Sequence, residues 1–393
     1  MDRAFPAVML FALCALLAAP GKLFSLSRYS ITPAHIGLAL CCSMLPLAFF
    51  STKGYWSSPV TKGLWGLRAL GVMLFLAASF RLSISWQDVL ALGGTLGLTL
   101  FYEVGFVIAR LGLLRRFLRY WLWIAAPLAA AVLIVLLPLI LTHGNVGSLV
   151  LYTNDVRRVI PSWPLYFGMY MVVTFWVAMA SLKKDWCRTC LVAIVLLTLL
   201  FTLARTAALG LAVSAVAALI LFWRRHRSVL SLVFLCAVAG LISLLVFYIK
   251  PSTGGGTGLE YTLVVRQARW QAGLEDWGEA PLVGIGLRSF TGAIESVEVR
   301  PGISIPTGSS HSDFVDLLVR GGLIWSAAFW LFVVVVVGMG FKRNRGQPML
   351  GFLACGSLSL LIGSAFLNPL KDVTLAAFFW IAVAAIGAGS TTG

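Results

Sequence analysis

The stretch "HSDFVDLLVRGGLIWSAAFWLFVVVVVGMGF" (His311–Phe341) decides the fold class of this chain. Its last 21 residues carry no charged side chain, and a helix needs about 20 apolar residues to cross a membrane. The ten residues before them are different in kind, because they include a histidine, two aspartates and an arginine. The stretch therefore predicts a membrane-spanning helix with a cluster of polar groups at its mouth.

The composition of the whole chain favours a membrane protein. Of its 393 residues, 60% are hydrophobic and only 11% are charged, whereas soluble proteins carry roughly 25% charged residues. The mean hydropathy is +0.95. Long continuous apolar runs indicate helices, because a membrane β-barrel would need short alternating segments. We therefore predict an all-α polytopic membrane protein and exclude a soluble one.

The apolar runs divide the chain into about twelve predicted transmembrane helices and one large loop. Residues 1–249 hold helices 1 to 9, residues 250–312 form the loop, and residues 313–393 hold helices 10 to 12. The first run resembles a signal peptide, but we treat it as an uncleaved helix because the later topology fits it. The expected helices are 5–19, 32–50, 64–80, 86–108, 121–141, 164–182, 189–204, 206–223, 228–249, 315–341, 348–367 and 373–389.

The basic residues predict the orientation in the membrane. With a cytoplasmic N-terminus, the clusters within 115–119, 183–188, 224–227 and 342–345 all fall in cytoplasmic connections, as the positive-inside rule requires. Both termini are then cytoplasmic and the large loop lies on the opposite side. The orientation depends on a helix break at Arg205, because one continuous helix there would move the cluster "WRRHR" outside. Since topology accounts for most of the +16 net charge, we expect no nucleic-acid partner.

The large loop is expected to contain a helix and then a turn. A loop of this length is usually functional or disordered, and its aromatic and apolar content argues against disorder. Apolar and aromatic residues recur at helical spacing in "LEYTLVVRQARWQAGLEDW". The helix is then broken by residues typical of turns, namely Pro281, Gly284 and Gly286.

Arg266 and Arg269 are the first candidates for chemistry. They lie three residues apart on the predicted loop helix, so their guanidinium groups project from nearly one face. Two such planar donor groups suit a phosphate or diphosphate, because each can bind two oxygens and keeps its charge. The alternative is salt bridging to acidic residues of the same loop, which are Glu260, Glu275, Asp276 and Glu279.

Three further arginines are anion-binding candidates. Arg205 stands between two almost continuous apolar runs, where an ionisable residue suggests function; alternatively it reaches the outer lipid headgroups. Arg157 and Arg158 follow Asp155 in a predicted outer loop, against the local charge preference. Their alternative role is contact with headgroups.

His311 is the candidate base. Ser310 and Asp313 fit the capping-box pattern, which makes His311 the first residue of the helix entering the membrane. The positive end of the helix dipole disfavours imidazolium, so His311 should stay neutral and be able to accept a proton. An inert histidine at a solvated helix end is the alternative. Asp316 and Arg320 are four residues apart and are expected to pair with each other.

Other charged residues have simpler predicted roles. Glu103 lies inside a predicted span and should pair with a basic residue such as Arg110 or Arg68. Lys371 and Asp372 fall in the last outer connection and could line the same mouth as His311. The sequence has no DxD or HExxH motif, so we expect a bound anion to be held by arginines, with no metal and no cofactor.

The quoted motifs together resemble the signature region of the bacterial O-antigen ligase and polymerase family. The tract "RQARWQAGLEDWGEAPLVGIGLRSF" supplies an arginine-containing helix and a P-x-x-G-x-G turn. The tract "SSHSDFVDLLVRGGLIW" supplies a histidine that opens a span with a Gly-Leu-Ile step, and "LARTAALGLA" resembles the family's arginine at the start of an earlier span. The twelve-span layout extends the resemblance to the whole chain.

The resemblance implies a glycosyltransferase, most closely an O-antigen ligase, in the bacterial inner membrane with its site facing the periplasm. The implied donor is a glycan on undecaprenyl diphosphate, the implied acceptor is a sugar of lipid A–core, and membrane lipids surround the protein. By the same resemblance, Arg205, Arg266 and Arg269 would hold the diphosphate, with Arg157 and Arg158 as further candidates, while His311 would activate or orient the acceptor hydroxyl. The rival interpretations are a polymerase of the same family and, in another class, a flippase or transporter of lipid-linked glycans.

Overall fold

The computed structural model describes most of the predicted helical core. The described ranges are 24–26, 29–31, 54–79, 96–142, 164–182, 186–202, 204–222, 259–286, 296–300, 303–306, 312–343 and 346–389, with isolated residues between 16 and 93 and at 238. The predicted helices 5–19, 32–50 and 228–249 lie outside these ranges except for isolated residues, and the predicted helix 86–108 is described in its second half.

The described part of the chain is predominantly helical, as predicted. Three helices are long and apolar enough to cross a membrane, at Pro59–Ala77, Leu114–Val135 and Asp313–Arg343, and several apolar helices are shorter. The helices are α3 (Pro59–Ser79), α5 (Phe101–Arg110), α6 (Leu114–Thr142), α8 (Pro164–Ser181), α9 (Trp186–Phe201), α10 (Arg205–Phe222), α12 (Leu259–Gly278), α13 (Asp313–Arg343), α14 (Pro348–Ser364) and α15 (Val373–Ala388), with the short 3-10 helix η2 (Pro369–Lys371).

Two short hairpins depart from the all-α prediction. Strands β1 (Phe24–Leu26) and β2 (Tyr29–Ile31) pair antiparallel, and so do β3 (Ser296–Arg300) and β4 (Ile303–Pro306) within the large loop. The second hairpin had a sequence signal, because valines and isoleucines alternate on either side of a Pro-Gly pair in "SVEVRPGISIP".

Helices α14 and α15 form the interior of the bundle. Every residue of α15 is buried, and α15 packs against α5 while α14 packs between α8 and α10. The α5–α15 approach is close at Gly105, where an added Cβ would lie 2.6 Å from the Cα of Ile381. Small residues at such crossings let apolar helices gain packing contacts that lipid cannot replace.

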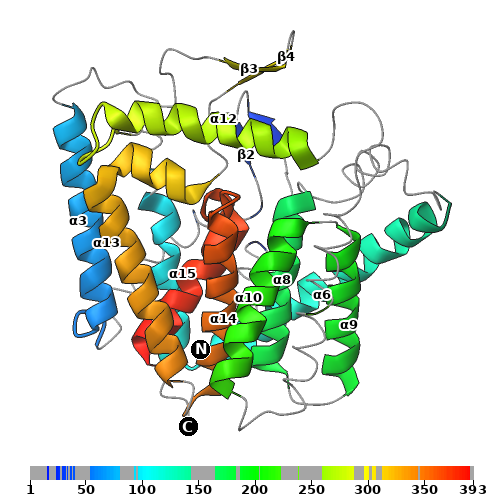
Figure 1. The fold of residues 1–393 in the computed structure, drawn as a ribbon. Helices are drawn as coiled ribbons and strands as arrows, with labels where there is room; N and C mark the ends of the chain where they lie inside the picture. Colours follow the sequence, from blue (N-terminus) through cyan, green and yellow to red (C-terminus); the bar gives the residue numbers. More distant parts are fainter. Residues whose placement is uncertain are drawn as a thin grey trace.

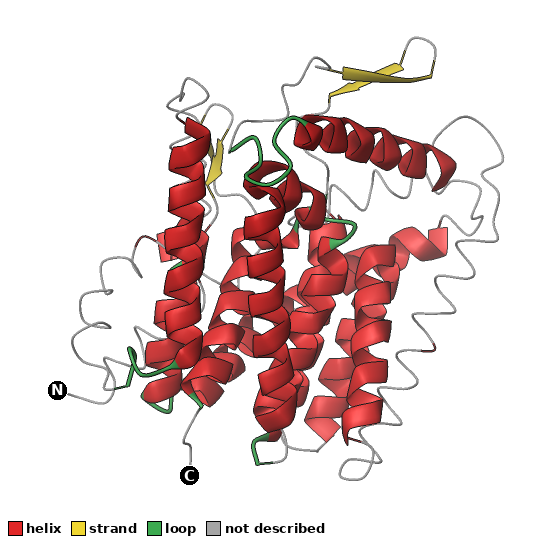
Figure 2. Ribbon diagram, turned by 60° about the vertical axis from the view of Figure 1, so that its left-hand side comes forward, coloured by secondary structure: helices red, strands yellow, loops and turns green. Residues whose placement is uncertain are grey.

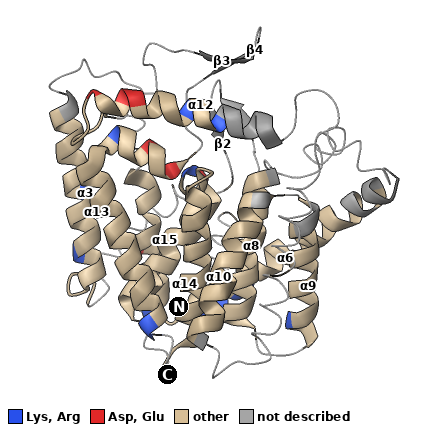
Figure 3. Cartoon of the chain, in the orientation of Figure 1, with Lys and Arg blue, Asp and Glu red and all other residues tan. Residues whose placement is uncertain are grey.

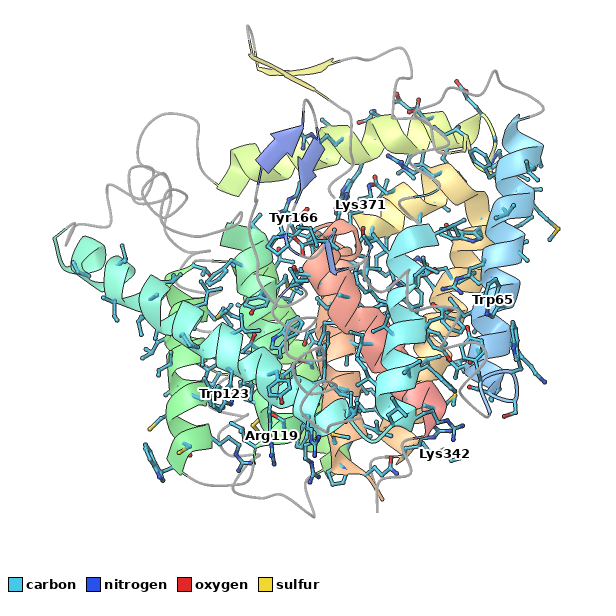
Figure 4. The ribbon with its side chains drawn as sticks, turned by 180° about the vertical axis from the view of Figure 1, so that it is seen from behind. Trp65, Arg119, Trp123, Tyr166, Lys342 and Lys371 are labelled. Atoms are coloured by element: carbon cyan, nitrogen blue, oxygen red, sulfur yellow. The ribbon has the colours of Figure 1, made fainter. Side chains whose placement is uncertain are left out.

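Helix α12 lies across one end of this bundle, with the β3–β4 hairpin beyond it (Figures 1 and 2). It confirms the helix predicted in the loop. Figure 4 shows Lys371 and Tyr166 at the α12 end and Arg119 and Lys342 at the opposite end. Arg119 and Lys342 therefore lie at the same end of the bundle; the side of the membrane that they face stays a prediction.

Helix α13 breaks near its start, which the sequence did not predict. Gly322 has φ 65° and ψ −176°, so α13 consists of a short first part and a long second part joined at a kink. Phe314 on the first part stacks on Trp330 of the second, with ring centroids 3.8 Å apart and ring planes at 6°. This stacking holds the two parts at a fixed angle.

The turn after α12 fills the break in α13. The amides of Ile285 and Gly286 donate to the carbonyls of Val319 and Arg320, at 2.9 and 3.0 Å. In return the amides of Leu323 and Ile324 donate to the carbonyls of Pro281 and Leu282, at 2.9 and 3.2 Å. Because the kink would otherwise leave these α13 groups without their helical partners, the two sequence motifs form one interlocked unit.

We expect Gly322→Ala and Gly284→Ala to destabilise the protein. Both residues have positive φ. A Cβ on Gly284 would overlap the carbonyl oxygen of Arg320, and a Cβ on Gly322 would overlap that of Leu282. Backbone strain of this kind costs about 1–3 kcal/mol, and the overlap adds to it. Gly338→Ala on the same helix is the matched control, because nothing lies within 4 Å of its added Cβ. Thermal unfolding in detergent should separate them; equal melting temperatures for Gly322→Ala and Gly338→Ala would contradict the interlock.

Candidate active site

The start of α13 differs from the predicted capping box. The helix begins at Asp313, and the Oγ of Ser312 accepts the amide of Val315 at 3.4 Å, so Ser312 is the cap. The prediction that Ser310 caps the helix and that His311 is its first residue was therefore wrong. His311 immediately precedes the cap in sequence and lies outside the described residues.

Asp313 has a structural role that spacing did not reveal. Its carboxylate is buried and accepts the Oγ of Ser364 at 3.1 Å and the amide of Leu370 at 3.0 Å. Its own amide donates to the carbonyl of Leu367 at 3.1 Å, and the Oγ of Ser312 donates to the carbonyl of Ser364 at 3.2 Å. These bonds fix the start of α13 to the end of α14 and to the connection between α14 and α15.

Asp316 pairs with a residue distant in sequence. Its carboxylate forms an ion pair with Lys371 on η2 and accepts the side-chain amide of Asn368 at 3.0 Å. The pairing with Arg320 expected from the four-residue spacing stays a prediction, and the salt bridge to Lys371 is a contact that the spacing did not indicate. Lys371, which was expected to line the same mouth as His311, lies beside Asp313 and Asp316 near the start of α13.

A cavity of about 150 Å³ opens beside these residues, between α3, α13 and η2. Most of its wall is apolar and includes leucines of α3 together with Phe329 and Trp380. Its charged lining residues are Arg68, Asp313, Asp316, Arg320 and Lys371. A cavity with apolar walls and a charged end suits an amphiphilic ligand.

Glu103 takes one of its two predicted partners. Arg68 donates to its carboxylate at 2.6 and 3.0 Å, and the hydroxyl of Tyr55 donates to it at 2.9 Å. Arg68 also reaches Thr99 through its Nε and a terminal nitrogen, both at 2.9 Å. Both charged residues are buried, so this pair is satisfied within the protein and forms a polar patch in the apolar wall of the cavity.

Helix α12 presents Arg266 and Arg269 at the same end of the bundle. Both side chains are partly buried, and Trp270 beside them contacts Phe366 after α14 with ring centroids 6.4 Å apart. Because Phe366 lies two residues before Asn368, this contact places the arginine-bearing part of α12 close to the α14–α15 connection.

The acidic residues described on α12 lie toward its C-terminal end. Figure 3 shows acidic residues toward one end of α12 and basic residues nearer its middle. Burial and the neighbouring carboxylates of Glu279 and Glu275 raise the pKa of Asp276, whereas a guanidinium partner would lower it. Glu275 accepts a hydrogen bond from Gln271 at 3.3 Å. The raised pKa disfavours Asp276 as the partner of the arginines, and salt bridging to Glu260, Glu275 or Glu279 stays an alternative.

Arg205 begins α10, as the predicted helix break requires. The hydroxyls of Ser214 and Ser359 lie 2.7 Å apart, so α10 and α14 run side by side. Near the start of α8, an added Cβ on Gly168 would meet Ala204 and Ala207 at the start of α10, and one on Gly363 at the end of α14 would meet Met169. Residue 205 is therefore level with the end of α14 at Ser364, where Ser312 binds. Only the backbone of Arg205 is described, and Arg157 and Arg158 lie outside the described residues.

Four elements thus meet at one end of the bundle: α12, the start of α10, the start of α13 and η2. Among the described residues, no group of three or more His, Cys, Asp or Glu side chains is placed to hold a metal ion. The positive groups that gather here are arginines and a lysine. The arrangement can hold an anionic group next to an apolar cavity.

The comparison with protein families agrees with this geometry. Residues 190–329 match the family model described as O-antigen ligase. The match includes α10, α12, the turn that interlocks with α13, and His311. It confirms the predicted family resemblance for this part of the chain. No curated protein matches the chain at the level of significance applied.

Proposed function

We propose that this chain, which belongs to the O-antigen ligase and polymerase family by its residues 190–329, transfers an O-antigen glycan from undecaprenyl diphosphate to a sugar of lipid A–core. The supporting observation is the meeting of α10, α12, α13 and η2 beside a cavity that is apolar with a charged end. The site faces the periplasm of the bacterial inner membrane, with both termini in the cytoplasm and about twelve helices in the membrane.

The reaction we propose is a direct displacement. The acceptor hydroxyl oxygen attacks the anomeric carbon, and the bond from that carbon to the diphosphate oxygen breaks. The electron pair of this bond leaves with the diphosphate, and the hydroxyl proton passes to the imidazole of His311. Attack from the face opposite the leaving group inverts the anomeric configuration.

Each proposed residue has a separate task. Negative charge grows on the diphosphate as it leaves, and Arg205, Arg266 and Arg269 stabilise it because fixed guanidinium donors need no rearrangement. His311 serves as general base, since a neutral imidazole near a hydroxyl can take its proton. Arg157 and Arg158 are further candidates for contact with the diphosphate. The donor already carries a diphosphate leaving group on its anomeric carbon, so no nucleotide is required.

Reconstitution tests the proposal. Purified protein is incubated with undecaprenyl-diphosphate-linked glycan and rough lipopolysaccharide, without ATP, and the product is resolved by size. Glycan joined to lipid A–core supports the ligase. Longer glycan that is still lipid-linked, formed from donor alone, would show the polymerase of the same family. Donor moved across a vesicle membrane without any new glycosidic bond would overturn both and favour a flippase.

Transfer is expected to persist in EDTA. The reason is that arginines, not a divalent cation, are assigned to the developing charge. Rates should be compared in untreated protein, in protein with EDTA, and in chelated protein given magnesium or manganese. A loss in EDTA that either metal restores would contradict the assignment.

A further inference from the structure

Lys371 is the most accessible member of the ion pair that joins η2 to α13. Its side chain is 45% exposed, whereas that of Asp316 is 2% exposed. Figure 4 shows Lys371 at the α12 end of the bundle, and it lines the cavity together with Arg320. Of the two paired groups, the ammonium group of Lys371 is therefore the one more exposed to a ligand in the cavity.

We propose that Lys371 is a further anion-contacting residue of the transfer site and binds the diphosphate of the lipid-linked donor. The inference rests on the proposed function and deepens it, since Lys371 lies outside the region that matches the family model. It assigns to the donor site a residue of the α14–α15 connection that lines the cavity.

The geometry allows Lys371 to hold both groups at once. An ammonium group has three N–H donors, and among the described residues the structure gives it one bond, to Asp316. The buried carboxylate is itself held by Asn368, so it anchors the ammonium and points it along the cavity wall. The remaining donors can reach phosphate oxygens without breaking the pair. Asp316 is then a positioning residue for the lysine.

The competing explanation is that Lys371 only neutralises Asp316. A buried carboxylate without its cation is costly, so a single substitution of either residue can disturb the fold under both explanations. Removing both charges separates them. In Asp316→Asn combined with Lys371→Met, neither member of this ion pair is left without the other, and the fold should survive whether or not Lys371 contacts the donor.

Binding of undecaprenyl diphosphate to the full-length protein provides the test, with undecaprenol as the uncharged control lipid. Lys371→Met and the double variant should both bind the diphosphate about 10- to 100-fold more weakly, the range expected for one charge-assisted hydrogen bond. Lys371→Arg should lose less, and binding of undecaprenol should not change. Diphosphate binding of the double variant at the wild-type level would overturn the inference and make Lys371 a counterion.

The same measurements separate this inference from the proposed function. Binding does not require transfer. Wild-type protein that binds the diphosphate but joins no glycan would therefore contradict the proposed reaction, while diphosphate binding by the Lys371 variants could still be compared. Transfer by the wild type together with unchanged diphosphate binding by Lys371→Met would sink only the inference. Melting temperatures of all variants verify that each compared protein is folded.

Discussion

Replacing Arg266 or Arg269 with alanine is expected to slow glycan transfer about 30- to 1,000-fold, because each removes a donor that acts on charge formed in the transition state. Both side chains lie on α12 above the α14–α15 connection, which Trp270 contacts through Phe366. A group that acts mainly on the transition state changes the turnover number more than substrate binding. Single-turnover transfer with saturating donor is the measurement.

Lysine at the same positions should restore only part of the activity. A lysine keeps the charge but replaces a planar group with several donors by a single point charge. Gln271→Ala is the matched control, since Gln271 is exposed on the same helix and its side chain bonds Glu275. If both arginine variants insert normally and transfer glycan at the control rate, the arginines are surface residues and the diphosphate is held elsewhere.

The helix break at Arg205 shows what the sequence alone could predict. The apolar runs on either side are almost continuous, so hydropathy could not divide them. The positive-inside rule required two helices because of the "WRRHR" cluster that follows. The structure has α9 ending at Phe201 and α10 beginning at Arg205. The basic cluster about 20 residues after Arg205 therefore predicted the helix break correctly, where the local hydropathy did not.

The polar contacts at the start of α13 show why local patterns failed. Three serines in the sequence, at 309, 310 and 312, could cap the helix. In the structure the cap is Ser312, whose hydroxyl also donates to the carbonyl of Ser364 on α14. Asp316 likewise bonds Lys371, a residue 55 positions away that its own helix spacing could not indicate. Spacing rules for one helix assume that its side chains meet each other, and they fail where another segment packs closer.

The interlock between the turn and the kink is an intermediate case. The Pro-x-x-Gly-x-Gly turn was recognisable as a helix break, and the Gly-Gly-Leu-Ile step was recognisable as part of a signature. That the two are one structural unit follows from four backbone hydrogen bonds across it. Backbone pairing between segments some 40 residues apart leaves no periodic trace in the sequence. The cavity was unpredictable for the same reason, since distant segments enclose it.

The second large effect is expected at His311. If its imidazole takes the acceptor proton, His311→Ala should lose most of the turnover while still binding undecaprenyl diphosphate, because the arginines remain in place. General-base catalysis contributes typically about 10²- to 10⁴-fold, which sets the size of the loss. Donor binding and single-turnover transfer, measured on the same preparations, separate the two effects.

Two further measurements define what the histidine does. A general base must be neutral, so transfer by the wild type should fall as the pH drops through the pKa of the imidazole, whose ordinary value is about 6.5. His311→Gln keeps a hydrogen-bonding group but offers no proton acceptor at neutral pH, so it should be nearly as slow as His311→Ala and should not show that acid limb. Loss of donor binding in His311→Ala would place the histidine in the diphosphate site or the fold. Normal turnover by His311→Gln would show that it orients the acceptor hydroxyl without accepting its proton, because an amide can hold a hydroxyl in place but cannot deprotonate it.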